Sequence, residues 1–378
     1  MSETEGISIG TPIGLYIHVP FCTVKCPYCN FYSMRGGEAE QTAYTQQVKA
    51  VLREQGSLLC RQADTLYFGG GTPALLGAKR LSYLVGTAKD VFGLANAEIT
   101  VEVNPTEYSP DFFERLVRVG VNRISMGLQS ADDTELKALG RRHTAEQAAQ
   151  AVRDAQAAGI QNISLDLMLA VPGQTTDSLR RSVAFCAGLG IQHVSAYLLK
   201  IEPGTPYYAR RDTLLLPGED ETADLYLLAC HELEQAGFAQ YEISNFAKPG
   251  FESRHNLKYW NAEEYWGVGP SAHSFLGDKR FYYSDDLGAF LQNTPPEYED
   301  EGGSLEEYAL LRLRLRDGLR NADCQKRFGV PIPPEYRKRA ETFDGTGLLL
   351  CDEEGIRLLP QGFLVSNLLS AEILLENG

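Results

Sequence analysis

The sequence predicts an α/β protein, a partial (β/α)6 barrel followed by a smaller C-terminal α+β domain. Six short runs rich in β-branched and aromatic residues recur between residues 13 and 204. Stretches with helical periodicity separate these runs, and the alternation stops after residue 204. Near-continuous apolar strands that alternate with helices are typical of a parallel sheet with right-handed crossovers. Six such units, in place of eight, indicate an incomplete barrel.

The strands and helices of the barrel can be placed in order. The predicted strands are 13–20, 64–73, 98–105, 123–130, 162–173 and 193–204, and the predicted helices between them are 39–55, 75–92, 110–119, 132–157 and 175–189. Several of the strands end in polar or glycine-rich residues. Parallel barrels place their functional groups at the carboxyl ends of the strands, so these residues are the first candidates for a site.

A different pattern follows the barrel. Residues 219–237 are expected to form a helix that ends at Gly237, and residues 241–283 form a dense aromatic stretch with both tryptophans. From residue 304, helices, a hairpin around residues 352–355 and a final helix predict a small winged-helix-like unit. The expected organisation is an N-terminal tail (1–12), the barrel (13–210) and a C-terminal domain (211–378).

The charge balance excludes some classes of partner. The chain has 35 Lys and Arg residues against 50 Asp and Glu residues, a net charge of −15. Such a surface repels phosphate backbones, so nucleic acid is not expected as the main partner. No apolar run approaches the roughly 20 residues of a membrane-spanning helix, and the acidic start lacks the pattern of a signal peptide. The composition predicts a cytoplasmic protein.

Three of the eight cysteines, Cys22, Cys26 and Cys29, lie directly after the first strand. In a reducing compartment such a cluster indicates ligands or catalysts rather than disulfides. Structural zinc normally needs four protein ligands, and a redox pair of Cys26 and Cys29 leaves Cys22 unexplained. Three thiolates on a [4Fe–4S] cluster leave one iron open. The residues alone leave these three possibilities open. The other five cysteines are expected to be small buried core residues.

With YIHVPF before it and a barrel strand beneath it, the CxxxCxxC spacing resembles the signature of the radical S-adenosylmethionine (SAM) superfamily. The resemblance implies that Cys22, Cys26 and Cys29 hold a [4Fe–4S] cluster. It also implies that the amino and carboxylate groups of SAM chelate the open iron. In that superfamily an electron from the cluster cleaves SAM to a 5′-deoxyadenosyl radical, which calls for an electron donor as a partner.

The same resemblance implies a set of SAM-binding residues at the strand ends. Residues 68–73, FGGGTP, resemble the element that holds the methionine group of SAM, and glycines allow backbone amides to approach a ligand closely. Isolated polar residues at strand ends are commonly caps, but four of them here match the SAM-contacting positions of one branch of the superfamily. A carboxylate suits ribose hydroxyls, and a guanidinium suits a carboxylate. The implied set is Tyr16, Tyr28, Gly70, Gly71, Thr72, Glu102, Gln129, Arg141 and Asp166.

That branch is the oxygen-independent coproporphyrinogen III oxidase-like family, which the chain resembles over nearly its whole length. The oxidases of this family have the pattern CxxxCxxCxC and carry an N-terminal extension. This chain has Phe31 at the position of the last cysteine and about a dozen residues before the first strand, so it is more similar to the HemW-type haem chaperones. RHNLKYW (254–260) also matches the HNxxYW element of that subgroup, which comprises His255, Asn256, Tyr259 and Trp260.

The aromatic stretch is compatible with haem, which needs an axial ligand, commonly histidine, and an apolar wall. The resemblance implies that His255 binds haem, with Asn256, Tyr259 and Trp260 as its neighbours, and His273 is a second candidate. The alternative is that these aromatic residues are domain core and that the histidines are hydrogen-bonded within it.

The leading hypothesis is a haem carrier that passes haem, covalently attached in the family, to respiratory haem proteins. It would act in the cytoplasm, with delivery at the membrane surface. Whether SAM is cleaved, and so whether the protein is an enzyme, stays open. The main alternative is an oxidase that decarboxylates coproporphyrinogen III to protoporphyrinogen IX. No residue favours a related methyltransferase or a haem-degrading enzyme on the same scaffold.

Overall fold

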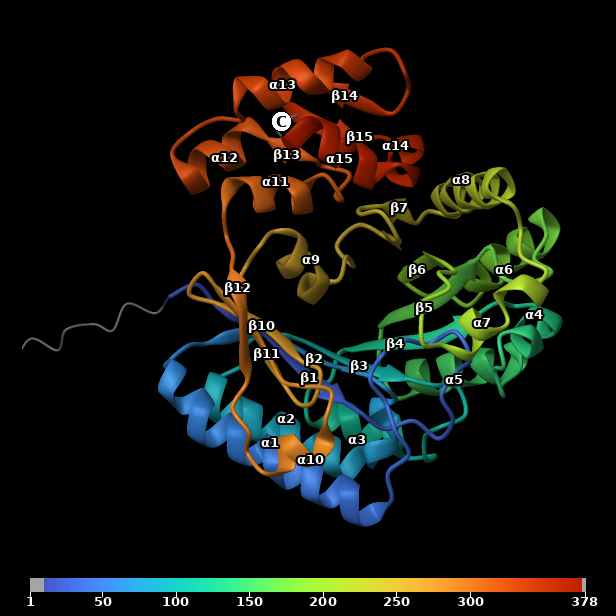
Figure 1. Cartoon of the computed structure of the whole chain (residues 1–378). Helices are drawn as coiled ribbons and strands as arrows, with labels where there is room; N and C mark the ends of the chain where they lie inside the picture. Colours follow the sequence, from blue (N-terminus) through green and yellow to red (C-terminus); the bar gives the residue numbers. More distant parts are fainter. Residues whose placement is uncertain (1–9, 376–378) are drawn as a thin grey trace, which may run out of the picture.

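The computed structural model describes residues 10–375, in which a 12-stranded sheet and a separate three-stranded sheet are present (Figure 1). Six parallel strands in consecutive order form the centre of the large sheet. They are β1 (Ile13–Val19), β2 (Ala63–Gly70), β3 (Glu98–Val103), β4 (Arg123–Gln129), β5 (Asn162–Leu169) and β6 (His193–Leu198). The predicted α/β class and the six predicted barrel strands are confirmed.

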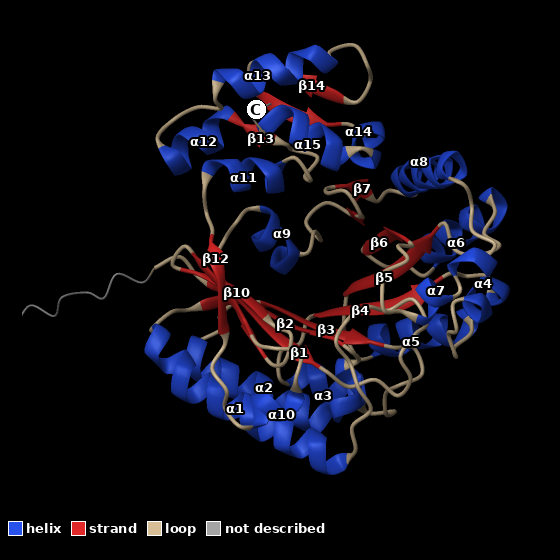
Figure 2. Cartoon of the chain, in the orientation of Figure 1, coloured by secondary structure: helices blue, strands red, loops and turns tan. Residues whose placement is uncertain are grey.

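Helices cover one face of this sheet, as Figure 2 shows. They are α1 (Glu38–Leu59), α2 (Gly77–Phe92), α3 (Phe112–Arg118), α4 (Asp133–Ala138), α5 (Ala145–Ala157) and α6 (Thr176–Gly188), with a 3-10 turn, η1 (Pro73–Leu76), before α2. The helix predicted over 132–157 is in fact two helices, α4 and α5. They separate because Gly140 takes a left-handed backbone (φ 71°) and the side chain of Thr144 caps α5.

The large sheet continues beyond the parallel strands at both edges. Beside β1 lie β9 (Tyr265–Val268), β10 (His273–Leu276), β11 (Lys279–Tyr282) and β12 (Glu297–Glu301), and beside β6 lie β8 (Asn245–Ala247) and β7 (Ala239–Gln240). The boundary expected at residue 210 therefore falls inside this sheet. The reason is that the aromatic stretch supplies strands to the barrel: Trp266 of β9 packs against Phe92 of α2, with ring centroids 5.9 Å apart.

The C-terminal unit is built around the small sheet, in the strand order β13-β15-β14. Its elements are α11 (Leu305–Arg312), β13 (Leu319–Arg320), α12 (Asn321–Phe328), α13 (Pro334–Ala340), η3 (Glu341–Phe343), β14 (Leu349–Cys351), β15 (Gly355–Leu358), α14 (Pro360–Leu364) and α15 (Ser366–Leu374). A helix, a strand, two helices and a hairpin follow one another, which is the winged-helix-like arrangement expected from the sequence. Along the chain, the helices between β6 and α11 are α7 (Pro206–Ala209), η2 (Arg211–Thr213), α8 (Glu219–Gln235), α9 (Arg254–Trp260) and α10 (Leu287–Leu291).

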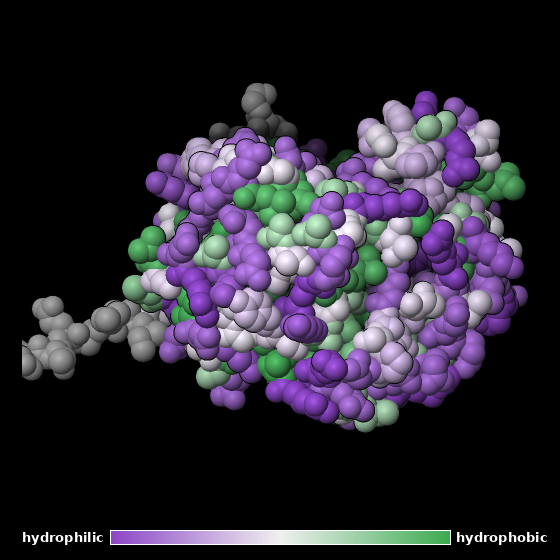
Figure 3. All heavy atoms as spheres, turned by 90° about the horizontal axis from the view of Figure 1, so that it is seen from below, coloured by the Kyte–Doolittle hydropathy of each residue, from purple (hydrophilic) through white to green (hydrophobic). Residues whose placement is uncertain are grey.

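The outer face seen in Figure 3 is mainly hydrophilic, with small apolar patches, in keeping with the net charge of −15. Within residues 10–375, none of the helices combines the length and the apolar character needed to cross a bilayer.

Helix α9 joins the barrel to the C-terminal unit, and Figure 1 shows it between them. The backbone amides of Arg254 and His255 each donate to the carboxylate of Glu98, the first residue of β3, at 3.1 Å. A carboxylate at a helix N-terminus satisfies free amides and complements the helix dipole. At the other end, the guanidinium of Arg314 lies over the ring of Trp260, 5.7 Å from its centroid. The helix is thus held from both sides.

Lys258 fixes the same helix to the start of the barrel. Its side chain is 4% exposed, and its Nζ lies 2.9 Å from Asp64 Oδ1, 3.1 Å from Glu263 Oε2 and 3.1 Å from the carbonyl oxygen of Pro12. The ammonium group donates hydrogen bonds to Pro12 and Glu263 and forms an ion pair with Asp64. The ammonium group therefore links α9 directly to the residues that begin β1 and β2.

Replacing Lys258 with alanine should lower the free energy of unfolding by about 3 kcal/mol, because Asp64 and Glu263 lose the cation between them. Urea denaturation of the purified protein measures the change. The control is Arg53→Ala, which removes an exposed pair with Asp90 at 4.0 Å and should change stability by less than about 0.5 kcal/mol. Equal effects of the two substitutions would contradict this account of α9.

Candidate functional site

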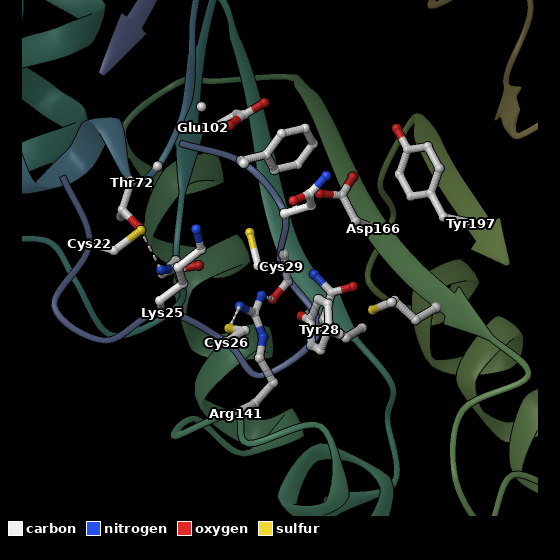
Figure 4. A pocket seen from close by; sticks show the side chains of 18 of the residues that line it. Cys22, Lys25, Cys26, Tyr28, Cys29, Thr72, Glu102, Arg141, Asp166 and Tyr197 are labelled. Atoms are coloured by element: carbon white, nitrogen blue, oxygen red, sulfur yellow. Dashed lines mark hydrogen bonds between the residues drawn. The ribbon is translucent and has the colours of Figure 1, made fainter. Parts of the chain in front are cut away.

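A cavity of about 580 Å³ lies at the carboxyl ends of the parallel strands, and Figure 4 shows it from close by. The loop after β1, the glycine turn after β2 and the ends of β3 to β6 supply its walls. All three clustered cysteines line it, together with eight of the nine residues of the implied SAM set. These eight are Tyr28, Gly70, Gly71, Thr72, Glu102, Gln129, Arg141 and Asp166. The fold therefore brings together residues that are far apart in the sequence.

The three cysteine thiols lie partly buried along the loop that follows β1. Cys22 Sγ is 3.7 Å from Thr72 Oγ1, and Arg141 Nη1 donates to Cys26 Sγ at 3.4 Å. Burial raises the pKa of the Cys22 thiol and that of the Cys29 thiol above the ordinary value. The contacts from Thr72 and Arg141 place a hydroxyl and a cation beside two of the thiols, where a bound thiolate would be stabilised.

Backbone hydrogen bonds close this loop on itself. Met34 N donates to Pro20 O at 2.8 Å, and Cys22 N donates to Met34 O at 2.9 Å. His18, on β1, approaches the loop as well, with its Nε2 3.0 Å from the carbonyl oxygen of Tyr32. The cysteines are therefore presented by a closed loop and not by a free segment.

The glycine turn after β2 lies directly against this loop. Gly71 N donates to Val19 O at 2.8 Å, and Thr72 N donates to Phe21 O at 2.7 Å. A Cβ atom at Gly71 would meet the carbonyl oxygens of Phe21 and Val19 at 2.6 and 2.8 Å, and Gly70 has a left-handed φ of 103°. Larger residues cannot be accommodated at these two positions without moving the loop. The turn therefore forms a narrow backbone cradle beside the thiols.

Two carboxylates face the cavity from β3 and β5. Tyr67 donates from its hydroxyl to Glu102 Oε1 at 2.8 Å, and Ser125 donates to Asp166 Oδ1 at 3.4 Å. Burial raises the pKa of Glu102 from 4.5 to about 7, although the Tyr67 hydrogen bond opposes the rise. Burial likewise raises the pKa of Asp166 to about 6. Both groups are poised to accept hydrogen bonds from a polar ligand that replaces water.

Arg141 and Gln129 complete the far wall. Arg141 Nη2 donates to the carbonyl oxygen of Gly127 at 2.8 Å, whereas its Nε is buried without a hydrogen-bond partner among residues 10–375. Gln129 has a left-handed φ of 73°, which is strained for a residue with a side chain. An unsatisfied guanidinium nitrogen and a strained backbone in one cavity are features of a site that is completed by a ligand.

Tyr16 is the one member of the implied SAM set that is not among the residues that line the cavity. Its hydroxyl lies 3.1 Å from His18 Nδ1, so it reaches the cysteine loop through His18. The cavity also takes residues that the sequence reasoning missed. Tyr197, Lys200 and Glu202 come from the end of β6, and the rule that selected the other strand ends would have found them.

The histidine of the HNxxYW element lies away from this cavity, packed under the first strands. His255 is 1% exposed, its Nδ1 is 2.7 Å from Thr65 Oγ1, and its Nε2 is 2.7 Å from the hydroxyl of Tyr259. Burial lowers its pKa to about 3, so the ring is neutral. Both ring nitrogens are in use, and a bond to haem iron would require one of these hydrogen bonds to break.

The other residues around the element have simple structural contacts. Asn256 N donates to the capping hydroxyl of Ser253 at 3.4 Å. His273 is half-exposed on β10, with its Nδ1 3.1 Å from Glu299 Oε2 and its ring stacked on Tyr282 at 5.2 Å. Of the five cysteines outside the loop, Cys186, Cys230 and Cys324 are buried and Cys351 is partly buried, whereas Cys60 is exposed at the end of α1, which corrects the expectation of burial there.

Comparison with known proteins agrees with this geometry. Residues 16–186 match the radical SAM superfamily, and residues 304–365 match the HemN C-terminal domain. The chain is 38% identical over 369 residues to the heme chaperone HemW of Mycobacterium tuberculosis, covering 93% of this chain and 92% of that one. It is 32% identical over 375 residues to the HemW of Lactococcus lactis, covering 97% and 98%.

Among solved structures, coproporphyrinogen III oxidase (HemN) from Escherichia coli superposes with a TM-score of 0.81 at 21% identity, over 96% of this chain and 90% of that one. The match over residues 16–186 makes this a radical SAM protein, and a radical SAM domain implies a [4Fe–4S] cluster and SAM. Within that class, the chain belongs to the HemW family.

The raised pKa of Glu102 predicts a pH-dependent stability difference between the ligand-free protein and its Glu102→Gln variant. Between pH 4.5 and about 7 the folded state keeps a proton on Glu102 that the unfolded state has lost. This contribution therefore makes the folded state less stable as pH rises through that interval. The stability of the variant relative to the wild type should rise from pH 4.5 to 7 and then level off, as measured by urea denaturation. A difference that does not change with pH would contradict the burial of this carboxyl.

Proposed function

We propose that the chain carries haem and transfers it to haem-requiring respiratory proteins, on a radical SAM scaffold that holds a [4Fe–4S] cluster and SAM. The observation that carries this proposal is the 38% identity to a heme chaperone over 369 residues, which span the barrel and the C-terminal unit alike. The HNxxYW helix, α9, lies where these two parts meet. A transient acceptor protein completes the proposed function.

In this proposal Cys22, Cys26 and Cys29 are the protein ligands of the cluster, and one iron is left for SAM. Within the described part of the chain, no three His, Cys, Asp or Glu side chains are placed to hold a single metal ion. A structural zinc site needs its ligands around one ion. A [4Fe–4S] cluster takes each thiolate on a different iron, and three thiols spaced along one cavity wall are compatible with that. The bound cluster would supply an electron to SAM, with a reductase as donor.

The remaining wall residues bind SAM in this proposal. The amides of the glycine turn at Gly70, Gly71 and Thr72 would hold its methionine group, because backbone can approach closely there. The Nε of Arg141, which lacks a hydrogen-bond partner among residues 10–375, would donate to the SAM carboxylate. Glu102 would accept hydrogen bonds from the ribose hydroxyls. Tyr28, Gln129 and Asp166 would enclose the rest of the molecule.

Haem would lie against the HNxxYW helix and its aromatic surroundings. The family resemblance gives His255 the role of haem ligand. In that role the ring must first lose its hydrogen bond to the hydroxyl of Thr65 or to that of Tyr259.

Phe31 distinguishes the proposal from the oxidase alternative. It occupies the position of the last cysteine in the CxxxCxxCxC pattern of the oxidases, and it is 68% exposed at the cavity wall. Phenylalanine at this position adds no thiol to the cluster site.

Alanine at Cys22, Cys26 or Cys29 should remove nearly all cluster iron from anaerobically reconstituted protein, since each change takes away one of three ligands. Iron analysis and the brown absorbance of the cluster measure the loss. Cys60→Ala is the matched control, because this thiol is exposed and outside the loop. Iron retention in all three loop variants would exclude the assigned ligands.

Purified wild-type protein mixed with haem should retain the haem through gel filtration, and a haem peroxidase stain after a denaturing gel reports covalent attachment. Absence of haem binding would remove the carrier proposal. A second assay supplies SAM, a reductant and coproporphyrinogen III without oxygen. The carrier proposal expects no turnover to protoporphyrinogen IX, and multiple turnovers would favour the oxidase instead.

A further inference from the structure

His255 is packed against two tyrosines that rise from the first two strands toward the cavity. The ring centroids of His255 and Tyr67 are 5.2 Å apart with an interplanar angle of 24°, and those of His255 and Tyr16 are 6.3 Å apart at 27°. Both pairs are stacked. The ring of His255 cannot turn, because Thr65 and Tyr259 hold its two nitrogens at 2.7 Å. A fixed imidazole therefore supports both tyrosine rings.

The first tyrosine leads to the wall of the cavity. Tyr67 lies in the middle of β2 and donates from its hydroxyl to Glu102 Oε1 at 2.8 Å. Glu102 lines the cavity, and Tyr67 is not among the residues that do so. A hydrogen bond from a neutral hydroxyl favours the ionised carboxylate and fixes its orientation. His255 therefore supports the ring of Tyr67, and Tyr67 in turn orients the carboxylate of Glu102.

The second tyrosine leads to the cysteine loop. The hydroxyl of Tyr16 lies 3.1 Å from His18 Nδ1, and His18 Nε2 lies 3.0 Å from the carbonyl oxygen of Tyr32. Tyr32 follows the three cysteines by three residues. A second series of contacts thus runs from His255 through Tyr16 and His18 to the backbone of the cysteine loop.

We propose that His255 is a positioning residue for SAM binding: through Tyr67 it sets Glu102, and through Tyr16 and His18 it steadies the cysteine loop. The inference rests on the proposed use of this cavity for SAM, and not on haem carriage. It gives the HNxxYW element a function in the radical SAM site. The buried, doubly hydrogen-bonded ring suits this role, and it would bind iron only after one of its two hydrogen bonds had broken.

A second histidine in the barrel provides a matched control. His193 is also fully buried, with its Nδ1 2.7 Å from Ser164 Oγ and its Nε2 2.8 Å from the hydroxyl of Tyr241. It therefore resembles His255 in burial and in both hydrogen bonds. Neither His193 nor Tyr241 lines the cavity. Replacing His193 tests what the loss of a buried, bonded imidazole does by itself.

The experiment measures SAM binding by equilibrium dialysis with cluster-reconstituted full-length protein, for His255→Ala, Tyr67→Phe, His193→Ala and Tyr241→Phe. The first two variants should bind SAM about tenfold more weakly than the wild type. In both, Glu102 is no longer held in position to accept a charge-assisted hydrogen bond from the ribose of SAM. The two control variants should bind SAM as the wild type does. The change in the electron paramagnetic resonance spectrum of the reduced cluster on SAM addition should be diminished in His255→Ala and retained in His193→Ala.

The pH profile of SAM binding gives a readout that a merely structural effect would not move. In Tyr67→Phe the pKa of Glu102 should rise, because the hydroxyl that favours its charged form is gone. SAM affinity should then begin to fall at a higher pH than in the wild type when the buffer is made more acidic. The titratable and charged groups that act on Glu102 are Tyr16, Tyr67, Arg123, Asp166, Tyr197 and Tyr259, and all but Tyr67 are unchanged in this variant.

Unchanged SAM affinity in both His255→Ala and Tyr67→Phe would overturn the proposal. Equal losses in His255→Ala and His193→Ala would do the same, since they would reflect general destabilisation. A His255→Ala variant that loses haem but binds SAM normally would return the histidine to the role of haem ligand. Wild-type protein that binds SAM but no haem would refute haem carriage and leave this inference standing. Wild-type protein that binds no SAM would refute both the proposed cofactor and this inference.

Discussion

The attachment of α9 beneath the first three strands is the constraint on which the rest of the molecule depends. Glu98 accepts the two leading amides of the helix, and the buried ammonium group of Lys258 joins the helix to Asp64. These contacts are charged, and Lys258 is shielded from water, so the helix has one position relative to the barrel. The C-terminal unit then takes its position from α9, because Arg314 lies over Trp260 at the far end. A helix of seven residues thus sets the arrangement of two larger parts.

Above this helix the barrel contains polar groups that a hydrophobic core would exclude. Burial raises the pKa of Glu102 and of Asp166, and the charge of Arg123, buried on β4, opposes both rises only in part. Such an arrangement weakens the ligand-free fold, because charged carboxylates are poorly solvated there. It also orients the acceptors before a ligand arrives, so that little reorganisation accompanies binding. The apolar contacts between the strands and the outer helices supply the stability that permits these polar groups.

The sequence was sufficient for features that depend on local pattern. Six strands, the cluster of Cys22, Cys26 and Cys29 directly after the first strand and the polar residues at the strand ends could be predicted, since each lies in a short stretch of sequence. The added strands β9 to β12 could not, because four- or five-residue strands carry little periodicity and β9 pairs with β1 from the other end of the chain. The contact of His255 with Thr65 spans 190 residues. The domain boundary at residue 210 failed to mark the end of the sheet for the same reason.

The network around His255 also limits how the two halves of the molecule can respond to ligands. A haem that coordinates His255 must displace the hydroxyl of Thr65 or of Tyr259, which frees the ring that supports Tyr67. Glu102 would then lose its orientation, and haem and SAM would oppose each other by the same factor in both directions. A haem bound elsewhere on α9 leaves the ring in place and is free of that penalty. Haem and SAM would therefore compete if His255 binds the iron, and they would bind independently if another residue does.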